Sequence, residues 1–260
     1  MLNPKKRDSP PVGGGCNLSQ PKLGSRLVFS INLINACSVV GKWGELADRV
    51  ADVDVVALTE TWLTDSTETL LDRLPDRTCY SQRRTDGRVG GGVALCIANT
   101  LVHREGTKLH TPAIQAVQCY IQSPSMPTSV LAVYRSPSAT AEEDASLLRY
   151  IQEAGGERVR TLVVGDFNAP EVHWEQGTAP PRSFGATLVD CLDTLGLIQH
   201  VKDPTRFRQG QRSSLLDLVI SSHVSDVTDL QITAPLGKSD HAVVEFTFNA
   251  IGRLRGYRTM

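Results

Sequence analysis

Apolar segments of strand length recur along the chain, and the helical patterns between them are few. Strands are expected at residues 27–34, 53–58, 93–98, 116–122, 129–134, 161–164, 215–221, 227–233 and 242–248. Helices are expected at residues 42–51, 142–153 and 183–194, mostly where apolar side chains recur at helical spacing. Because helices and strands do not alternate strictly, the pattern favours two stacked mixed sheets with helices outside over a doubly wound parallel sheet.

Length and composition fit one large domain. The chain has 260 residues, of which 40% are hydrophobic and 21% are charged, and its net charge is −1. This balance gives no overall attraction to nucleic acid and leaves only local basic patches for that role. No run reaches the ~20 apolar residues that a membrane span requires. The six cysteines show no C-x-x-C spacing, so we expect reduced, buried thiols in an intracellular protein.

The two ends of the chain differ in composition from its centre. Residues 1–25 contain four prolines, a glycine triplet and the basic run Lys5-Lys6-Arg7. Such a segment buries too little apolar surface to fold, so we expect a flexible arm, with the basic run as a nuclear address or a solvated tail. The folded domain is expected at residues 26–249 and a C-terminal tail at 250–260.

Three of the expected strands carry an acid at one end. These acids are Glu60, Asp166 and Asp240. A carboxylate at the end of a buried strand is costly without a partner, and a hard divalent cation with oxygen ligands relieves that cost. Asn168 lies two residues after Asp166 and offers an amide donor that adds no negative charge. Each acid alone also suits an ordinary polar turn, but their repetition on distant segments favours a metal-assisted hydrolase.

His241 needs a carboxylate to orient its ring. The adjacent Asp240 would point to the opposite face of a strand. Asp217 lies inside the apolar segment 215–221 and, if buried, needs a polar partner of its own. A His–Asp pair fixes the imidazole tautomer and raises its basicity, so we expect Asp217 to be that partner.

Two groups of arginines occupy loops. Arg83, Arg84 and Arg88 surround a turn before a glycine triplet, and Arg206 and Arg208 lie in a later loop. Either group could clamp a phosphate backbone or could simply form a solvated face. The chain contains no serine nucleophile elbow, phosphate loop or H-E-x-x-H zinc motif.

In their order along the chain, these motifs resemble the endonuclease/exonuclease/phosphatase superfamily, which includes abasic-site endonucleases and pancreatic deoxyribonuclease. The six elements that carry this resemblance are Asn35-Ala36-Cys37-Ser38, Leu58-Thr59-Glu60-Thr61-Trp62, Tyr134-Arg135, Gly165-Asp166-Phe167-Asn168, Leu216-Asp217-Leu218 and Ser239-Asp240-His241. Their flanks, such as Glu60-Thr61-Trp62-Leu63 and Gly90-Gly91-Gly92-Val93-Ala94, look like the endonuclease domain of non-LTR (LINE-like) retrotransposons.

The resemblance implies an α+β fold, namely a four-layer αββα sandwich of two stacked mixed β-sheets flanked by helices, as in DNase I. It also implies phosphodiester hydrolysis that depends on Mg²⁺, with Mn²⁺ as a substitute ion. In that chemistry Glu60 would hold the metal, with Asn35 and Asp240 near it, while Asn168 and Tyr134 would support the phosphate.

The same resemblance implies that Asp217 orients His241. His241 would then either contact the scissile phosphate or act as the base. Whether His241 or Asp166 activates water stays open at this point. Two positions depart from the family pattern. Cys37 stands where retrotransposon relatives have Arg and abasic-site enzymes have Asp, which would weaken the site. Ser136 replaces a common proline, a mild change.

The implied partner is double-stranded DNA, which would be nicked to leave a 3′-hydroxyl that primes reverse transcription. We therefore expect a nuclear monomer that makes no membrane contact and whose reverse transcriptase is encoded elsewhere or lost. Two alternatives stay open. One is a phosphatase of the same superfamily that acts on phosphoinositides or nucleotide-derived substrates. The other is a catalytically inactive nucleic-acid-binding remnant.

Overall fold

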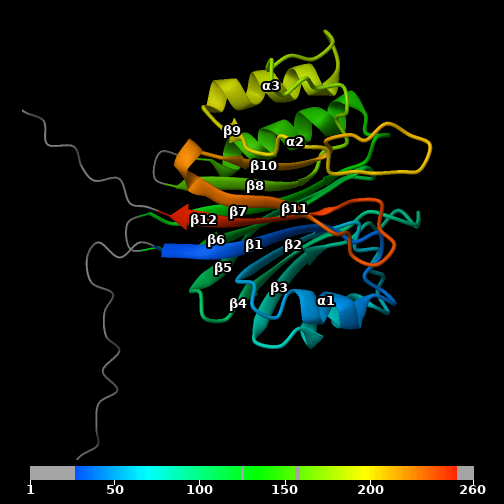
Figure 1. Ribbon diagram of the computed structural model, residues 1–260, viewed down its shortest axis with the longest axis vertical. Coiled ribbons are helices and arrows are strands. Elements are labelled where there is room, and N and C mark those ends of the chain that lie inside the picture. Colours follow the sequence, from blue (N-terminus) through cyan, green and yellow to red (C-terminus); the bar gives the residue numbers. More distant parts are fainter. Residues whose placement is uncertain (1–26, 124–125, 156–158, 251–260) are drawn as a thin grey trace, which may run out of the picture.

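Two six-stranded mixed sheets stack face to face, and helices cover their outer surfaces (Figure 1). This computed structural model describes residues 27–123, 126–155 and 159–250. Helices α2 (Ala141–Ala154) and α3 (Phe184–Leu195) cover one sheet, and α1 (Trp43–Arg49) lies against the other. The expected four-layer αββα sandwich is confirmed.

The first sheet has the strand order β11-β12-β1-β2-β4-β3. Its strands are β1 (Leu27–Asn35), β2 (Val55–Thr59), β3 (Arg77–Gln82), β4 (Val93–Ala98), β11 (Val227–Thr233) and β12 (Val243–Ala250). Strands β1 and β2 run parallel, whereas the other neighbours are antiparallel. A short 3-10 helix η1 (Glu68–Arg73) precedes β3, and a second, η2 (Val224–Asp226), precedes β11.

The second sheet has the strand order β5-β6-β7-β8-β10-β9. Its strands are β5 (His103–His110), β6 (Ile114–Ile121), β7 (Thr128–Arg135), β8 (Arg160–Asp166), β9 (Ile198–Gln199) and β10 (Asp217–Ser221). Strands β7 and β8 run parallel, and the others pair antiparallel. The central strands are buried on both faces, which explains why they read as continuous apolar runs.

Local signals set the helix boundaries. Thr140 and Glu143 form a capping box at the start of α2. Ser183 accepts a hydrogen bond from the Ala186 amide at the start of α3, and Gly196 ends that helix with a φ of 63°. Both helices therefore lie where the sequence predicts them. No helix in the described part of the chain is long and apolar enough to cross a membrane.

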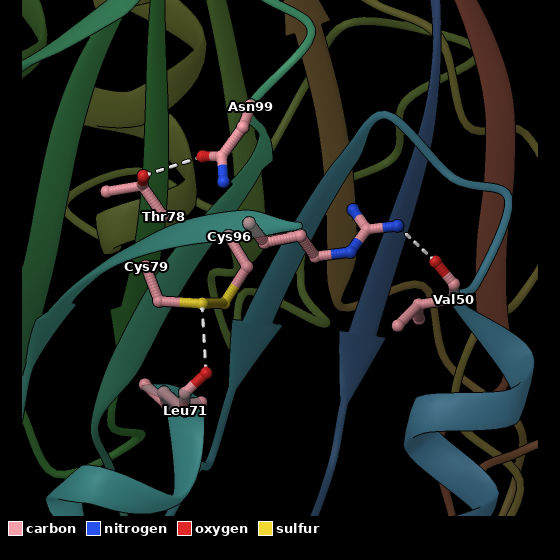
Figure 2. Close-up of a disulfide and its surroundings, with 7 residues drawn as sticks. Val50, Leu71, Thr78, Cys79, Cys96 and Asn99 are labelled. Atoms are coloured by element: carbon pink, nitrogen blue, oxygen red, sulfur yellow. Dashed lines mark hydrogen bonds between the residues drawn. A yellow bond between two sulfur atoms is a disulfide. The ribbon is translucent and has the colours of Figure 1, made fainter. Parts of the chain in front are cut away.

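One disulfide corrects the expectation that all cysteines are reduced. Cys79 in β3 lies directly opposite Cys96 in β4, with Cα atoms 4.0 Å apart, and the two sulfurs are bonded (Figure 2). Opposed residues of antiparallel strands bring their side chains together. The expectation was wrong because this pairing depends on sheet register, which the spacing of cysteines does not reveal. Cys37, Cys119 and Cys191 are free thiols in the described residues.

Several strands end or begin at the same end of the sandwich. Parallel β1 and β2 finish there, and so does β8, while the antiparallel β4, β10 and β12 start there. The loop segments 200–216 and 234–242 lie at this end, on the right of Figure 1. The expected N-terminal arm and nearly all of the expected tail lie outside the described residues, and Ala250 still pairs with Leu27.

Candidate active site

A cleft of about 1230 Å³ opens at this end of the sandwich. It gathers most of the side chains that the sequence singles out. Those lining it are Asn35, Glu60, Arg84, Tyr134, Asp166, Asn168, Arg206, Arg208, Asp240 and His241. Segments that are far apart in the chain therefore meet in one hollow, as a shared site requires.

Register places two of these groups, Tyr134 and Asp166, in a row with Asp217 along the second sheet. Tyr134 in β7 is the direct partner of Asp166 in β8, and Asp166 is the direct partner of Asp217 in β10. Asp166 is 2% exposed and Asp217 is 1% exposed. The row follows from the hydrogen-bonding pattern of neighbouring strands rather than from loop flexibility.

His241 and Asp217 form the expected pair. The Nδ1 atom of His241 lies 2.7 Å from Oδ2 of Asp217, and both side chains are buried. The hydroxyl of Thr205 donates to the same carboxylate oxygen at 2.6 Å. Sequence reasoning missed Thr205 because a threonine in a loop carries no signal for such a contact. Oδ1 of Asp217 has no hydrogen-bond partner within the described chain.

Asp166 is fixed through both of its oxygens. Asn35 donates from Nδ2 to Asp166 Oδ2 at 2.9 Å, and the Asn168 amide donates to Oδ1 at 3.1 Å. The side-chain amide of Asn168 donates to the Arg135 carbonyl at 2.8 Å. In return, the Arg135 guanidinium donates to the Phe167 and Asn168 carbonyls. Arg135 thus holds the Gly-Asp-Phe-Asn turn, a role that the sequence did not reveal.

Glu60 is held by a strained backbone and two donors. Its φ of 52° is left-handed, as are those of Cys37 (39°) and Asn168 (47°) beside the same cleft. Such conformations are rare in residues other than glycine and cluster at functional sites. Glu60 Oε2 accepts from Trp62 Nε1 at 2.5 Å and from the Gly91 amide at 2.6 Å. The direction of its carboxylate is therefore fixed.

Burial and neighbouring charges perturb the titration of the site. Burial alone would lower the pKa of His241, but the charge and hydrogen bond of Asp217 raise it to about 9. Burial, followed by the charge of Asp217, raises the pKa of Asp166 well above its ordinary value. Burial, together with the charge and hydrogen bond of Glu60, also raises the pKa of Tyr134. At neutral pH this combination favours a charged imidazolium and a neutral phenol.

Asp240 lines the cleft, and its side chain is 30% exposed. Arg206 donates to its Oδ2 at 3.0 Å, and the Cys37 thiol lies 3.8 Å from its Oδ1. Burial raises its pKa, but the charges of His241 and Arg206 outweigh this and lower it overall. Asp240 therefore stays ionised next to the free thiol.

Only some of the five arginines that the sequence suggests for substrate binding line the cleft. Arg84, Arg206 and Arg208 line it. Arg83 is instead paired with Asp65 and lies 3.6 Å from Glu68. Arg88 pairs with Asp86 at 2.6 Å and donates to the Pro112 carbonyl.

The donor set fits a divalent cation. Asp166, Asp217 and His241 bring one atom each to within 4.8 Å of one another, and the two carboxylates can bind a cation while the imidazole is protonated. Glu60 and Asp240 add carboxylate oxygens to the same cleft, and hard oxygen ligands suit Mg²⁺. The unpartnered Oδ1 of Asp217 also leaves a buried acceptor for a cation or proton.

Comparison with known proteins agrees with this geometry. Residues 128–245 match the family model described as endonuclease-reverse transcriptase. The chain is similar to this family over these residues, which make up less than half of its length. Within curated proteins, it is similar to the probable RNA-directed DNA polymerase from transposon X-element of Drosophila melanogaster, with 29% identity over 177 residues. This match covers 63% of the chain and 18% of that relative, so the chain spans less than a fifth of the relative's length.

Solved structures share the fold of this chain. The endonuclease domain of TRAS1, a telomere-specific non-LTR retrotransposon, matches with a TM-score of 0.67 and 16% identity, covering 85% of this chain and 98% of that domain. A variant of the 3′ phosphatase NExo from Neisseria, bound to a product DNA hairpin, matches with a TM-score of 0.63 and 17% identity, covering 85% of this chain and 99% of that one. At sequence identities of 16% and 17%, the similarity to these two structures shows a shared fold alone.

Proposed function

We propose that the chain is a metal-dependent phosphodiester hydrolase that nicks double-stranded DNA and leaves a 3′-hydroxyl. The observation that carries this proposal is the His241–Asp217 pair, which lies beside Asp166 and shares a cleft with Glu60. The retrotransposon-type matches support DNA as the substrate. The DNA-bound NExo structure supports the same substrate class.

Glu60 would hold Mg²⁺, or Mn²⁺ in its place, with Asp240 and Asn35 close to the ion. When bound, the cation stabilises the charge that develops on the phosphate and the leaving oxygen. Trp62 and the Gly91 amide already occupy Oε2 of Glu60, so they orient the carboxylate before the ion arrives. Such preorganisation reduces the cost of assembling the site.

His241 would donate a hydrogen bond to a phosphate oxygen. Its Nδ1 is engaged by Asp217, which leaves Nε2 for the substrate, and its raised pKa of about 9 keeps the ring protonated near neutral pH. Asp166 would take the proton from the attacking water. Asn35 and the Asn168 amide hold its carboxylate in place, and its raised pKa brings it closer to the working pH.

Tyr134 would steady the phosphate from the other side of Asp166. Its raised pKa keeps the hydroxyl protonated, so it can donate a hydrogen bond. Arg206 and Arg208 line the cleft and would contact the DNA backbone. A chromosomal DNA target would require the protein to act in the nucleus. We infer that it acts there as a monomer, together with a reverse transcriptase.

Nicking of supercoiled plasmid tests this proposal. We expect relaxed circles with the wild-type protein and Mg²⁺, and none with EDTA or with Glu60→Gln, because the amide is a poorer ligand than the carboxylate. Glu68→Gln, an exposed acid outside the cleft lining, is the matched control and should nick normally. Equal nicking by Glu60→Gln would overturn the metal assignment. Phosphate release from a 3′-phosphorylated oligonucleotide without nicking would instead favour a phosphatase.

A further inference from the structure

Arg84 is buried beside the cleft with most of its hydrogen-bonding capacity unused. Its side chain is 8% exposed, and Nε and Nη2 have no hydrogen-bond partner among the residues that the structure describes. Nη1 reaches the Val89 carbonyl only at 3.5 Å, and Nε lies 3.8 Å from Asp86 Oδ1. Both distances exceed those of good hydrogen bonds. A buried guanidinium in this state lowers the stability of the free protein.

The guanidinium lies next to the proposed metal ligand. A Cβ atom on Gly90 would sit 3.6 Å from Arg84 Nη1 and 3.4 Å from Glu60 Oε2. A Cβ on Gly91 would sit 3.1 Å from Arg84 Cζ, so glycine there permits the close approach of the side chain. The positive charge of Arg84 also opposes the burial that raises the pKa of Tyr134. Arg84 thus lies close to both Glu60 and Tyr134.

Three other arginines, Arg135, Arg83 and Arg88, have their charges matched by carboxylates of the protein. Arg135 forms two hydrogen bonds with Asp144, at 2.6 and 3.0 Å, besides its bonds to backbone carbonyls. Arg83 and Arg88, from the same turn as Arg84, are held in ion pairs at the surface. Arg84 differs because its ion pair with Asp86 is long, at 3.8 Å, and shares that acid with Arg88, while Nε and Nη2 of the buried guanidinium have no hydrogen-bond acceptors among the described residues. An anion that enters the cleft would supply them.

We propose that Arg84 binds a phosphate oxygen of the nucleic-acid backbone beside Glu60 and Tyr134, and that Arg83 and Arg88 do not. This inference rests on the proposed function, since the phosphate belongs to the same DNA substrate. A guanidinium suits the task because its planar donors match phosphate oxygens. The carboxylates lining the cleft repel a phosphodiester, and Arg84 offsets that repulsion on the side of Glu60.

Binding without hydrolysis tests the inference. Fluorescence anisotropy of a short labelled DNA duplex in EDTA is measured over a series of salt concentrations for the wild type and for Arg84→Met. Because the variant neutralises one phosphate fewer, binding should weaken and the slope of log K against log salt should fall by about 0.9. Arg83→Met and Arg88→Met are matched controls from the same turn and should keep the wild-type slope. Arg84→Lys should restore most of it.

Thermal unfolding separates this role from a structural one. The free protein leaves Arg84 without good acceptors, so Arg84→Met should keep or raise Tm. An unchanged salt slope, a fall in Tm or a failure of Arg84→Met to fold would overturn the inference. Because EDTA blocks metal-dependent hydrolysis, the result does not depend on nicking. Arg84-dependent binding by a wild-type protein that fails to nick plasmid would refute the proposed function and uphold the inference. A wild-type protein that binds no DNA would refute both.

Discussion

The cleft joins two halves that are built differently. One half comes from the ends of β7, β8 and β10, where Asp166 and Asp217 are almost completely buried within strands. The other half comes from loops of the first sheet, where Glu60 and Asp240 are partly exposed and Glu60 has a left-handed backbone. The buried half is suited to holding protons, and the exposed half is suited to binding a cation and the substrate.

Charge explains why both halves are needed. Burial raises the pKa of Asp166, and Asp217 adds to that shift, so two acids next to each other cannot both remain charged without compensation. His241 comes from the loop before β12 in the first sheet, yet it pairs with Asp217 in the second. The imidazole therefore links the two halves and supplies the positive charge that the buried half lacks.

After loss of the proposed metal ligand Glu60, removing this link should have the largest effect on catalysis. We expect His241→Ala to lower the nicking rate by at least ~10²-fold, the lower range for a group that transfers or holds a proton. DNA affinity measured by anisotropy should change much less, because the defect falls on the reaction. His173→Ala is the matched control, since His173 lines the same cleft. Near-wild-type nicking by His241→Ala would show that His241 has no role in the mechanism. The buried half of the cleft would then not be the part that handles protons.

The buried half was more predictable from sequence than the exposed half. Apolar runs identify β8 and β10, and a lone Asp217 inside such a run has to find a partner, which is the physical reason that His241 could be named. By contrast, strand β3 at the edge of the first sheet is absent from the expected strands. None of its residues is fully buried, so its composition carries no strand pattern.

Features that depend on loop conformation or strand register escaped sequence reasoning. Thr205 reaches Asp217 only because its loop folds back over β10. Arg83 and Arg84 are adjacent and equally charged, and only the turn decides which one is buried. The same limit applies to Cys79 and Cys96, whose bond requires knowledge of which residues face each other across β3 and β4.

The pH dependence of stability should show how the buried half of the cleft differs from the exposed half. The folded protein holds the His241 proton with a pKa of about 9, against an ordinary 6.5, so the stabilisation is complete below about 6.5 and is lost as pH rises toward 9. The difference corresponds to about 3 kcal/mol. Urea unfolding in EDTA between pH 6.5 and 9 should show this decline in wild type and a flatter profile in Asp217→Asn. Parallel profiles for the two proteins would mean that the Asp217–His241 pair does not raise the pKa of His241.

The smallest effect is expected in the exposed half, at the arginine loop. Charge reversal at Arg206 and Arg208 should weaken DNA binding and lower its salt dependence, by about 0.9 in slope for each phosphate that is no longer neutralised. Arg149→Glu, on the exposed face of α2, is the control and should leave the slope unchanged. Arg206 also pairs with Asp240, so its reversal places two carboxylates together, whereas Arg208 has no such neighbour among the ion pairs of the described residues. If Arg208→Glu alone leaves the slope unchanged while Arg206→Glu lowers it, the loop acts through Asp240, and the exposed half binds DNA less directly than its charge suggests.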